Sequence, residues 1–289
     1  MEEAFFIRFH EVILLIYLVS MVCLIIDVFQ KNYRLQNIGF YALGIVWFCQ
    51  TISLTMFIIW QKQLPLTSLI ESFYVLTWLI LTITFVMSVL RQSEFMIAFL
   101  NVIGFVFMTI HTFHPRQFKL DGARLTALNE LLFFHISLAL LSYVVFAVAF
   151  VNAIIYLIQY RNLKEKRFTQ NFFRMSSIAT LEKLVFYSSL IGVIFMFISL
   201  VLGIQWGMVS IGYDIFLDLK VISSIIIFIA YSIFITLRLT RRFKQSFLMN
   251  LNIMLFLCCM INLVVVTQLS TFHQWTGVYF ILIGGKHYA

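Results

Sequence analysis

The sequence predicts an all-α integral membrane protein with about eight transmembrane helices and both termini extracytoplasmic. The chain of 289 residues is 62% hydrophobic, has a mean hydropathy of +1.00 and carries only 11% charged residues. A soluble domain carries about a quarter. The apolar residues form long aromatic-rich runs, and the cations lie mainly between them. A chain that cannot cover its surface with polar groups is surrounded by lipid.

Each apolar run is long enough to be a membrane span, because about 20 helical residues cross the hydrocarbon core. None shows the alternation of a membrane barrel, and backbone groups in lipid then require helices. Glu2 and Glu3 precede the first run, so we expect a retained span rather than a cleaved secretory signal. The predicted spans are 10–29, 38–60, 68–90, 95–112, 131–159, 184–204, 220–240 and 247–269.

The orientation follows from the Lys and Arg residues in the connections. With the N-terminus outside, thirteen of the twenty lie in inner connections, chiefly 160–183 and 238–246. The positive-inside rule therefore predicts that both termini are extracytoplasmic. The same rule accounts for the net charge of +8, which does not indicate a nucleic-acid partner. In this orientation the six histidines lie at or beyond the outer ends of the spans.

Several residues in or near the predicted spans are polar or reactive. His135 lies four residues into span 131–159, and it is either a hydrogen-bonded structural residue or a metal ligand. Glu71, in span 68–90, either has a functional role or is hydrated among the headgroups. Asp27, near an inner span end, is expected to be interfacial. The four cysteines form no C-x-x-C pair and are interpreted as packing residues.

His273 follows the last predicted span, at the same outer face as His135. Two imidazoles at one face can form an axial pair for heme iron, although six histidines also allow accidental pairs.

The chain contains no P-loop, G-x-G-x-x-G, H-E-x-x-H or nucleophile elbow, so we expect a protein that is not an enzyme. A small-molecule permease is a further possibility. It requires polar residues along a path through the bilayer. Such residues here fall on one predicted span, where they more often bond adjacent helices: Asn250, Asn252 and Asn262.

Three stretches together resemble the cytochrome c assembly family of heme-handling membrane proteins. The family pattern P-L-x-x-x-Y-E-S is matched by Pro65-Leu66 and Glu71-Ser72, with Ile70 in place of Tyr. The stretch HISLALLSY, which begins at His135, resembles the segment around the family's first outer histidine, and His273 takes the place of the second.

The resemblance covers residues 65–275 and implies three regions. Residues 1–64 would form the first two transmembrane helices. Residues 65–275 would form an assembly-like membrane domain with helices three to eight and a degenerate outer loop at 205–220. Residues 276–289 would be a C-terminal tail.

The segment 205–220, QWGMVSIGYDIFLDLK, corresponds to the Trp-rich heme platform of the family, with the pattern W-G-x-Y-W-x-W-D-P-K. Gly212, Asp218 and Lys220 are retained, and Trp206 has a counterpart upstream. Aliphatic residues replace the tryptophans, and they offer a porphyrin neither a stacking face nor an N–H donor. The alternative is a plain connector in which Asp218 caps the next helix. The substituted positions are Ile211, Ile215, Leu217, Leu219 and, for an intramembrane histidine, Thr236.

These substitutions imply the HemX branch of the family rather than a working cytochrome c synthase of the CcsA, ResC or CcmC type. The resemblance implies a heme-linked protein of the bacterial plasma membrane that restrains the level of glutamyl-tRNA reductase. A cytoplasmic heme-biosynthesis enzyme would be contacted through the basic inner connections. The alternative is a subunit that handles or exports heme for cytochrome c biogenesis. The implied heme ligands are His135 and His273, and the implied binding region adds Trp206, Gly212, Asp218, Lys220 and Glu71.

Overall fold

The computed structural model of the chain describes residues 2–61, 65–66, 68–90, 93–114, 130–266 and 269. Within these residues, eight helices are long and apolar enough to cross a membrane, which confirms the predicted spans. The chain is therefore a multi-pass membrane protein that lies in a lipid bilayer. The eight helices are α1 (Glu2–Gln30), α2 (Tyr33–Gln61), α3 (Leu69–Val89), α4 (Glu94–Phe113), α5 (Glu130–Lys164), α7 (Ile178–Ile211), α8 (Leu219–Thr240) and α9 (Gln245–Ile261).

Three short elements join or end these helices. The helix α6 (Gln170–Arg174) lies in the connection between α5 and α7. A 3-10 helix, η2 (Gly212–Leu217), joins α7 to α8, and a π-helical turn, η3 (Asn262–Val266), follows α9.

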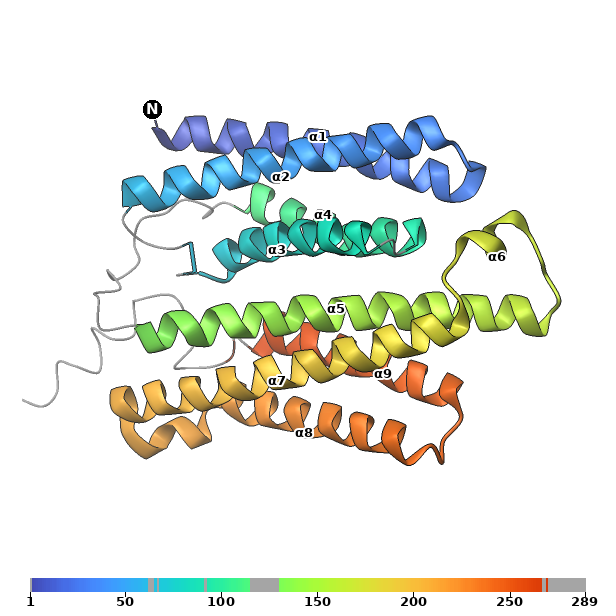
Figure 1. Ribbon diagram of the computed structural model, residues 1–289. Coiled ribbons are helices and arrows are strands. Elements are labelled where there is room, and N and C mark those ends of the chain that lie inside the picture. Colours follow the sequence, from blue (N-terminus) through green and yellow to red (C-terminus); the bar gives the residue numbers. More distant parts are fainter. Residues whose placement is uncertain are drawn as a thin grey trace, which may run out of the picture.

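The helices pack in two groups that meet at α5 (Figure 1). The first group contains α1 to α4, and the second contains α5, α7, α8 and α9. The pair α5 and α7 has the most extensive interface, and α3 and α4 of the first group also contact α5. The helix α5 is the most buried of the described spans, because helices of both groups pack on it.

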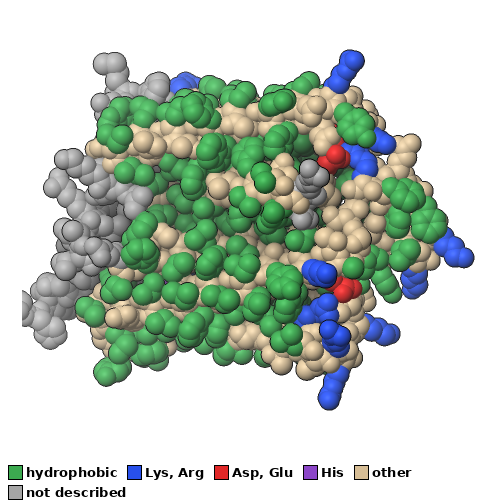
Figure 2. Space-filling view, in the orientation of Figure 1, with side chains coloured by type: hydrophobic (Ala, Val, Ile, Leu, Met, Phe, Trp, Pro, Cys, Tyr) green, Lys and Arg blue, Asp and Glu red, His purple; other side chains and the backbone are tan. Residues whose placement is uncertain are grey.

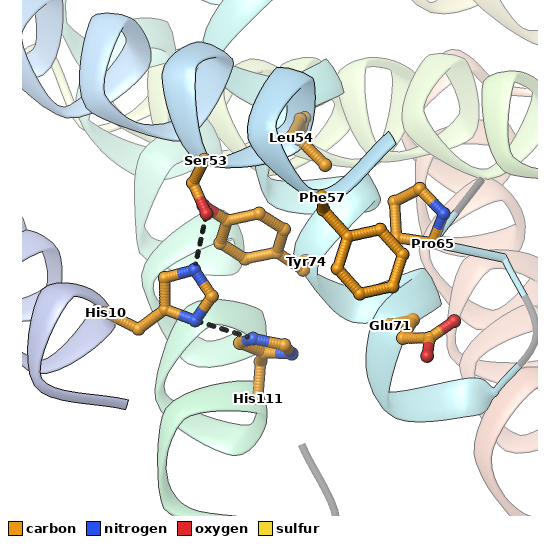
Figure 3. Close-up of a pocket in the computed structure, with 8 residues that line it drawn as sticks. All are labelled: His10, Ser53, Leu54, Phe57, Pro65, Glu71, Tyr74 and His111. Atoms are coloured by element: carbon orange, nitrogen blue, oxygen red, sulfur yellow. Dashed lines mark hydrogen bonds between the residues drawn. The ribbon is translucent and has the colours of Figure 1, made fainter. Parts of the chain in front are cut away.

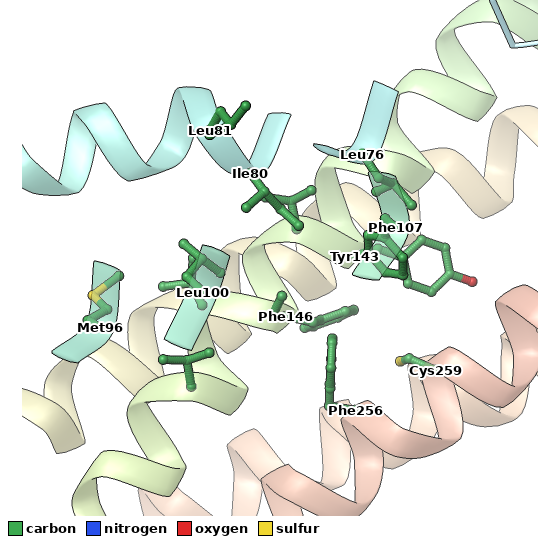
Figure 4. Close-up of a cluster of buried hydrophobic side chains, with 14 of the residues drawn as sticks. Leu76, Ile80, Leu81, Met96, Leu100, Phe107, Tyr143, Phe146, Phe256 and Cys259 are labelled. Atoms are coloured by element: carbon green, nitrogen blue, oxygen red, sulfur yellow. The ribbon is translucent and has the colours of Figure 1, made fainter. Parts of the chain in front are cut away.

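Buried side chains from α3, α4, α5 and α9 join the two groups (Figure 4). Within the second group, the ring of Phe146 on α5 stacks on Tyr231 of α8 with the centroids 4.0 Å apart. Gly192 of α7 lies directly against the Phe146 ring, because a Cβ at this position would be 2.5 Å from Cε1. Small residues let transmembrane helices approach closely, and this close approach allows the van der Waals contacts that hold helices together in lipid.

The connections alternate between two ends of the molecule, which we name the basic end and the histidine end. The basic end holds twelve of the Lys and Arg side chains that the structure describes, and they gather at one side of Figure 2. The histidine end holds His10, His111, His114 and His135, with Arg8 and Lys220. The positive-inside rule predicts that the basic end faces the cytoplasm.

One feature differs from the sequence predictions, and a second adds detail to them. The helix α7 continues past the predicted span end at residue 204 to Ile211, because nothing breaks it before Gly212, whose φ of +69° suits glycine. The outer connection is therefore much shorter than 205–220. Asp27, which was predicted to be interfacial, lies in the last turn of α1 at the basic end, and its side chain is 1% exposed and forms an ion pair with Arg174.

Substitution Gly192→Ala should destabilise the bundle, because the new methyl group would overlap the Phe146 ring. We expect a loss of about 1–3 kcal/mol in the free energy of unfolding, measured by detergent-induced unfolding in mixed micelles. The matched control is Gly44→Ala on α2, where a Cβ would meet nothing within 4 Å. Equal stability of the two variants would show that the close α5–α7 approach is not needed.

Candidate functional site

His135 is held against α7 by reciprocal hydrogen bonds with Ser199. Its Nδ1 lies 2.7 Å from the Ser199 carbonyl oxygen, and the Ser199 hydroxyl donates to the His135 carbonyl at 2.8 Å. A carbonyl oxygen only accepts, so Nδ1 carries the proton and Nε2 carries the lone pair. Metal-ligating histidines adopt the same arrangement, in which one ring nitrogen is fixed by a carbonyl or carboxylate.

Gly203 provides the space for this imidazole on α7. A Cβ at Gly203 would be 2.5 Å from Cε1 of His135 and 2.6 Å from its Nδ1. The ring therefore lies directly against the backbone of α7. The position and the tautomer of His135 are set by Ser199 and Gly203 together.

The residues that match the family's heme-platform pattern lie between the end of α7 and the start of α8. Trp206 is partly buried near the end of α7, and its carbonyl accepts a hydrogen bond from Ser210. The Asp218 carboxylate accepts from the backbone N–H groups of Lys220 at 2.9 Å and Val221 at 3.3 Å. Asp218 is thus the N-cap of α8, as the connector interpretation predicts.

The aliphatic residues that replace the tryptophans have different environments. Ile215 is 1% exposed and packs on Gly207, where a Cβ would lie 2.5 Å from the Ile215 side chain. Leu217 is 78% exposed, and Tyr213 beside it is 80% exposed. The segment has therefore become partly a packing element of the second helix group and partly an apolar surface at the histidine end.

Glu71 lies in the first helix group, whereas His135 faces α7 in the second. Ser68 caps α3 by accepting from the Glu71 N–H at 3.1 Å, which places Glu71 in the first turn. The Glu71 side chain lines a small cavity with His10 and His111 (Figure 3). The cavity measures about 10 Å³, which is about the space of one water molecule.

His10 and His111 form a hydrogen-bond chain that the sequence does not reveal. Nδ1 of His111 lies 2.9 Å from the Ile70 carbonyl, so this nitrogen donates. Nε2 of His111 then accepts from Nδ1 of His10 at 3.2 Å, and the Ser53 hydroxyl donates to Nε2 of His10 at 2.8 Å. Both imidazoles are 2% exposed, and the Tyr74 ring lies 4.6–4.7 Å from each ring centroid.

A larger apolar groove of about 350 Å³ lies between α2, α3 and α5. This volume is in the range of ligand sites. Phe133 and Ser137 line the groove from α5, whereas His135 is bonded to α7. Residues two apart on a helix point in nearly opposite directions. The groove is therefore not the pocket of the His135 imidazole.

Among the described residues, no group of three or more His, Cys, Asp and Glu side chains is placed to hold a metal ion. Heme requires only axial ligation of its iron, and the His135 tautomer fits that role. His273, the second predicted ligand, lies outside the described residues, as does the neighbouring Trp275. That His135 and His273 hold one heme iron therefore stays a prediction.

Substitution Gly203→Ala should displace the His135 ring and remove the Nδ1 contact with Ser199. The ¹⁵N chemical shifts of labelled histidine report which ring nitrogen is protonated. We expect the Nδ1–H tautomer for His135 in the parent and a mixture of tautomers in the variant, with Gly44→Ala unchanged. An Nε2–H tautomer in the parent would contradict the assigned hydrogen bond.

Comparisons with known proteins agree with this architecture. The family model described as "Cytochrome C assembly protein" matches residues 66–273. Protein HemX of Bacillus subtilis (strain 168) is 32% identical over 269 residues, which cover 93% of this chain and 98% of that protein. Protein HemX of Brevibacillus brevis is 27% identical over 266 residues, which cover 92% and 97%. No solved structure matches. The chain belongs to the cytochrome c assembly protein family.

Proposed function

We propose that this protein is a non-catalytic regulator of heme biosynthesis in the bacterial plasma membrane and binds heme at its outer face. The observation that carries the proposal is the 2.7 Å contact between Nδ1 of His135 and the Ser199 carbonyl oxygen, the arrangement in which metal-ligating histidines are held. Because Ser199 and Gly203 already order this ring, little conformational freedom is lost when a ligand binds.

His135 and His273 would hold the heme iron, and neighbouring residues would hold the porphyrin. Heme supplies an iron centre whose two open axial positions accept imidazole nitrogens. Lys220, in the first turn of α8, can pair with a propionate carboxylate, and the Trp206 indole can contact the macrocycle. Glu71 belongs to the His10–His111 cluster, and we place it outside the heme site.

A ligand changes the behaviour of a protein only if it binds two states with different affinities. An iron centre held by His135 and His273 would join α5 to the segment that follows α9 and so favour one packing of the second helix group. The helix α5 runs without interruption from Glu130 to Lys164 at the basic end. We propose that a cytoplasmic enzyme, glutamyl-tRNA reductase in the role that the family resemblance implies, responds to this packing at the basic end.

Heme transfer for cytochrome c maturation is less well supported by the same region. The burial of Ile215 and the capping role of Asp218 use platform positions for packing and helix initiation. A regulator can bind heme without presenting it to an acceptor. The similarity to two proteins named HemX over nearly their full length favours the HemX branch, for which the resemblance implies regulation.

His135→Ala and His273→Ala should each weaken the Soret band of protein purified from heme-replete cells, because each removes a proposed axial ligand. The matched control is His10→Gln, since His10 is a buried histidine of the other helix group. Its Soret band should match that of the parent. A band that survives both alanine variants, or is lost only in His10→Gln, would place heme elsewhere.

Neutralising six exposed cations of the two basic connections should abolish regulation without changing heme content. The changes to glutamine would be at Lys164, Lys166, Arg167, Arg241, Arg242 and Lys244, all exposed. Reductase abundance, measured by immunoblotting, should rise to the level of cells without this protein. Lys31→Gln with Arg34→Gln, on another connection of the same end, is the control and should keep regulation. Regulation that persists in the sixfold variant would rule out these connections as the partner site.

A further inference from the structure

A seam of polar contacts joins α1 and α4 from one end of the membrane span to the other. At the histidine end His10 bonds to His111. In the middle, the Tyr17 hydroxyl donates to the Asn101 side-chain oxygen at 2.9 Å. At the basic end, Asp27 of α1 and Glu94 of α4 both bind Arg174.

The seam holds the two helices in one antiparallel register. Seventeen residues separate His10 from Asp27 along α1, and the same number separates Glu94 from His111 along α4. These contacts are buried between apolar helices, and a buried polar pair that slips out of register loses its partner. A shift of α1 against α4 would therefore disturb all levels of the seam together.

Arg174 connects this seam to the second helix group, because α6 lies in the connection between α5 and α7. Its Nη2 is 2.6 Å from the Asp27 carboxylate, its Nη1 donates to the Asp27 carbonyl at 2.9 Å, and its Nε donates to Glu94 at 2.9 Å. The guanidinium also lies 5.6 Å from the centroid of the Phe95 ring. The Arg174 side chain is only 10% exposed. The planar fork of an arginine suits such a bridge between two carboxylates.

The residues just before Arg174 form an exposed surface that is both basic and aromatic. Lys164, Lys166 and Arg167 are exposed cations, and Glu165 is the one exposed acid of the described basic end. Phe168 is 54% exposed and Phe173 is 74% exposed. Exposed aromatic side chains among cations are the composition of a protein-binding surface rather than of a solvated loop.

The length of α5 exceeds the thickness of a bilayer with its headgroups. The 35 residues of α5 measure about 52 Å, or about 49 Å along the membrane normal at a tilt of about 20°. A bilayer with its headgroups is about 40–45 Å thick. Figure 1 shows that α5 extends past the neighbouring helices at the basic end. A soluble protein can therefore reach the connection that follows Lys164.

We propose that residues 164–173 are a docking surface for an acidic face of a cytoplasmic protein, and that Arg174 holds this surface in register with the α1–α4 seam. The cations complement an acidic partner, and the two phenylalanines provide apolar anchors. Because Arg174 fixes the connection in advance, less ordering is needed on binding. The identity of the partner as glutamyl-tRNA reductase rests on the proposed function.

The test replaces Phe173 with the photo-crosslinking residue p-benzoylphenylalanine in the full-length protein in living cells. We expect a covalent adduct with glutamyl-tRNA reductase, identified by mass spectrometry. The same replacement at Tyr33, an aromatic residue beside the α1–α2 connection that is 59% exposed, is the matched control. We expect about tenfold less adduct there.

A second arm tests Arg174 with the crosslinker kept at position 173. Arg174→Met removes the bridge and should lower the adduct yield about tenfold. Arg174→Lys keeps the positive charge but lacks the planar guanidinium that binds both carboxylates, so the adduct yield should be intermediate. Asp27→Asn serves as the second variant if Arg174→Met does not insert, because it weakens the bridge from the opposite side. Unchanged yields in the variants that insert would exclude the holding role of Arg174.

The remaining outcomes separate the two proposals. Adducts with lipid alone would assign the surface to the membrane, and equal adducts at positions 173 and 33 would show that it is not specific. Either result would overturn the docking surface. Reductase abundance in cells with and without the protein is measured in parallel. If abundance responds but no reductase adduct forms at 173, only the docking surface fails. If abundance does not respond, the proposed function fails, and a missing adduct then overturns both.

Discussion

A polar group inside a bilayer must find its partner within the protein, and the arrangement of both helix groups depends on this constraint. In the first group the constraint produces the α1–α4 seam, where histidine, tyrosine and carboxylate side chains meet in one register. In the second group it ties His135 to Ser199 of α7. Apolar packing alone allows helices to slide in lipid, whereas such pairs fix their positions.

In the second helix group, glycine residues of α7 make room for side chains that pack against this helix. Gly192 admits the Phe146 ring, Gly203 admits the His135 ring, and Gly207 admits Ile215, all along one helix. The same close approach that builds the α5–α7 interface therefore also builds the candidate heme ligand. An imidazole that lies in the main packing interface is held in place before any ligand binds. Ligand binding at that imidazole would therefore affect the α5–α7 interface, which is the most extensive among the described helices.

The two helix groups give the proposed regulation a physical route. Heme would act on α5 at the histidine end, and α5 leads without a break to the basic surface at 164–173. Arg174 then connects that surface to the first helix group. The position of the surface depends on both helix groups. A change in the packing of either group would therefore move the surface that a cytoplasmic partner would contact. This arrangement needs no catalytic residue.

The spans were predictable because apolar length is a local property, and His135 was proposed as a ligand because an imidazole within a span requires an explanation. Other features depend on which helices become neighbours. The His10–His111 pair and the burial of Asp27 both require α1 beside α4, and nothing local marks that adjacency. For the same reason the sequence does not reveal that Glu71 lines a cavity with His10 and His111.

Two further features were hidden for different reasons. Arg174 is one of several similar cations in its connection, and only tertiary structure separates the buried one from the exposed ones. The end of α7 was misplaced because Gly212, rather than the first polar residue, terminates the helix.

The most direct test of the central claim is a cryo-electron microscopy map of the full chain in lipid nanodiscs equilibrated with hemin. The account predicts porphyrin density at the histidine end, with the iron within bonding distance of Nε2 of His135 and its second axial ligand from the segment that follows α9. Density at the His10–His111 pair or in the α2–α3–α5 groove, or a map without porphyrin at saturating hemin, would contradict it.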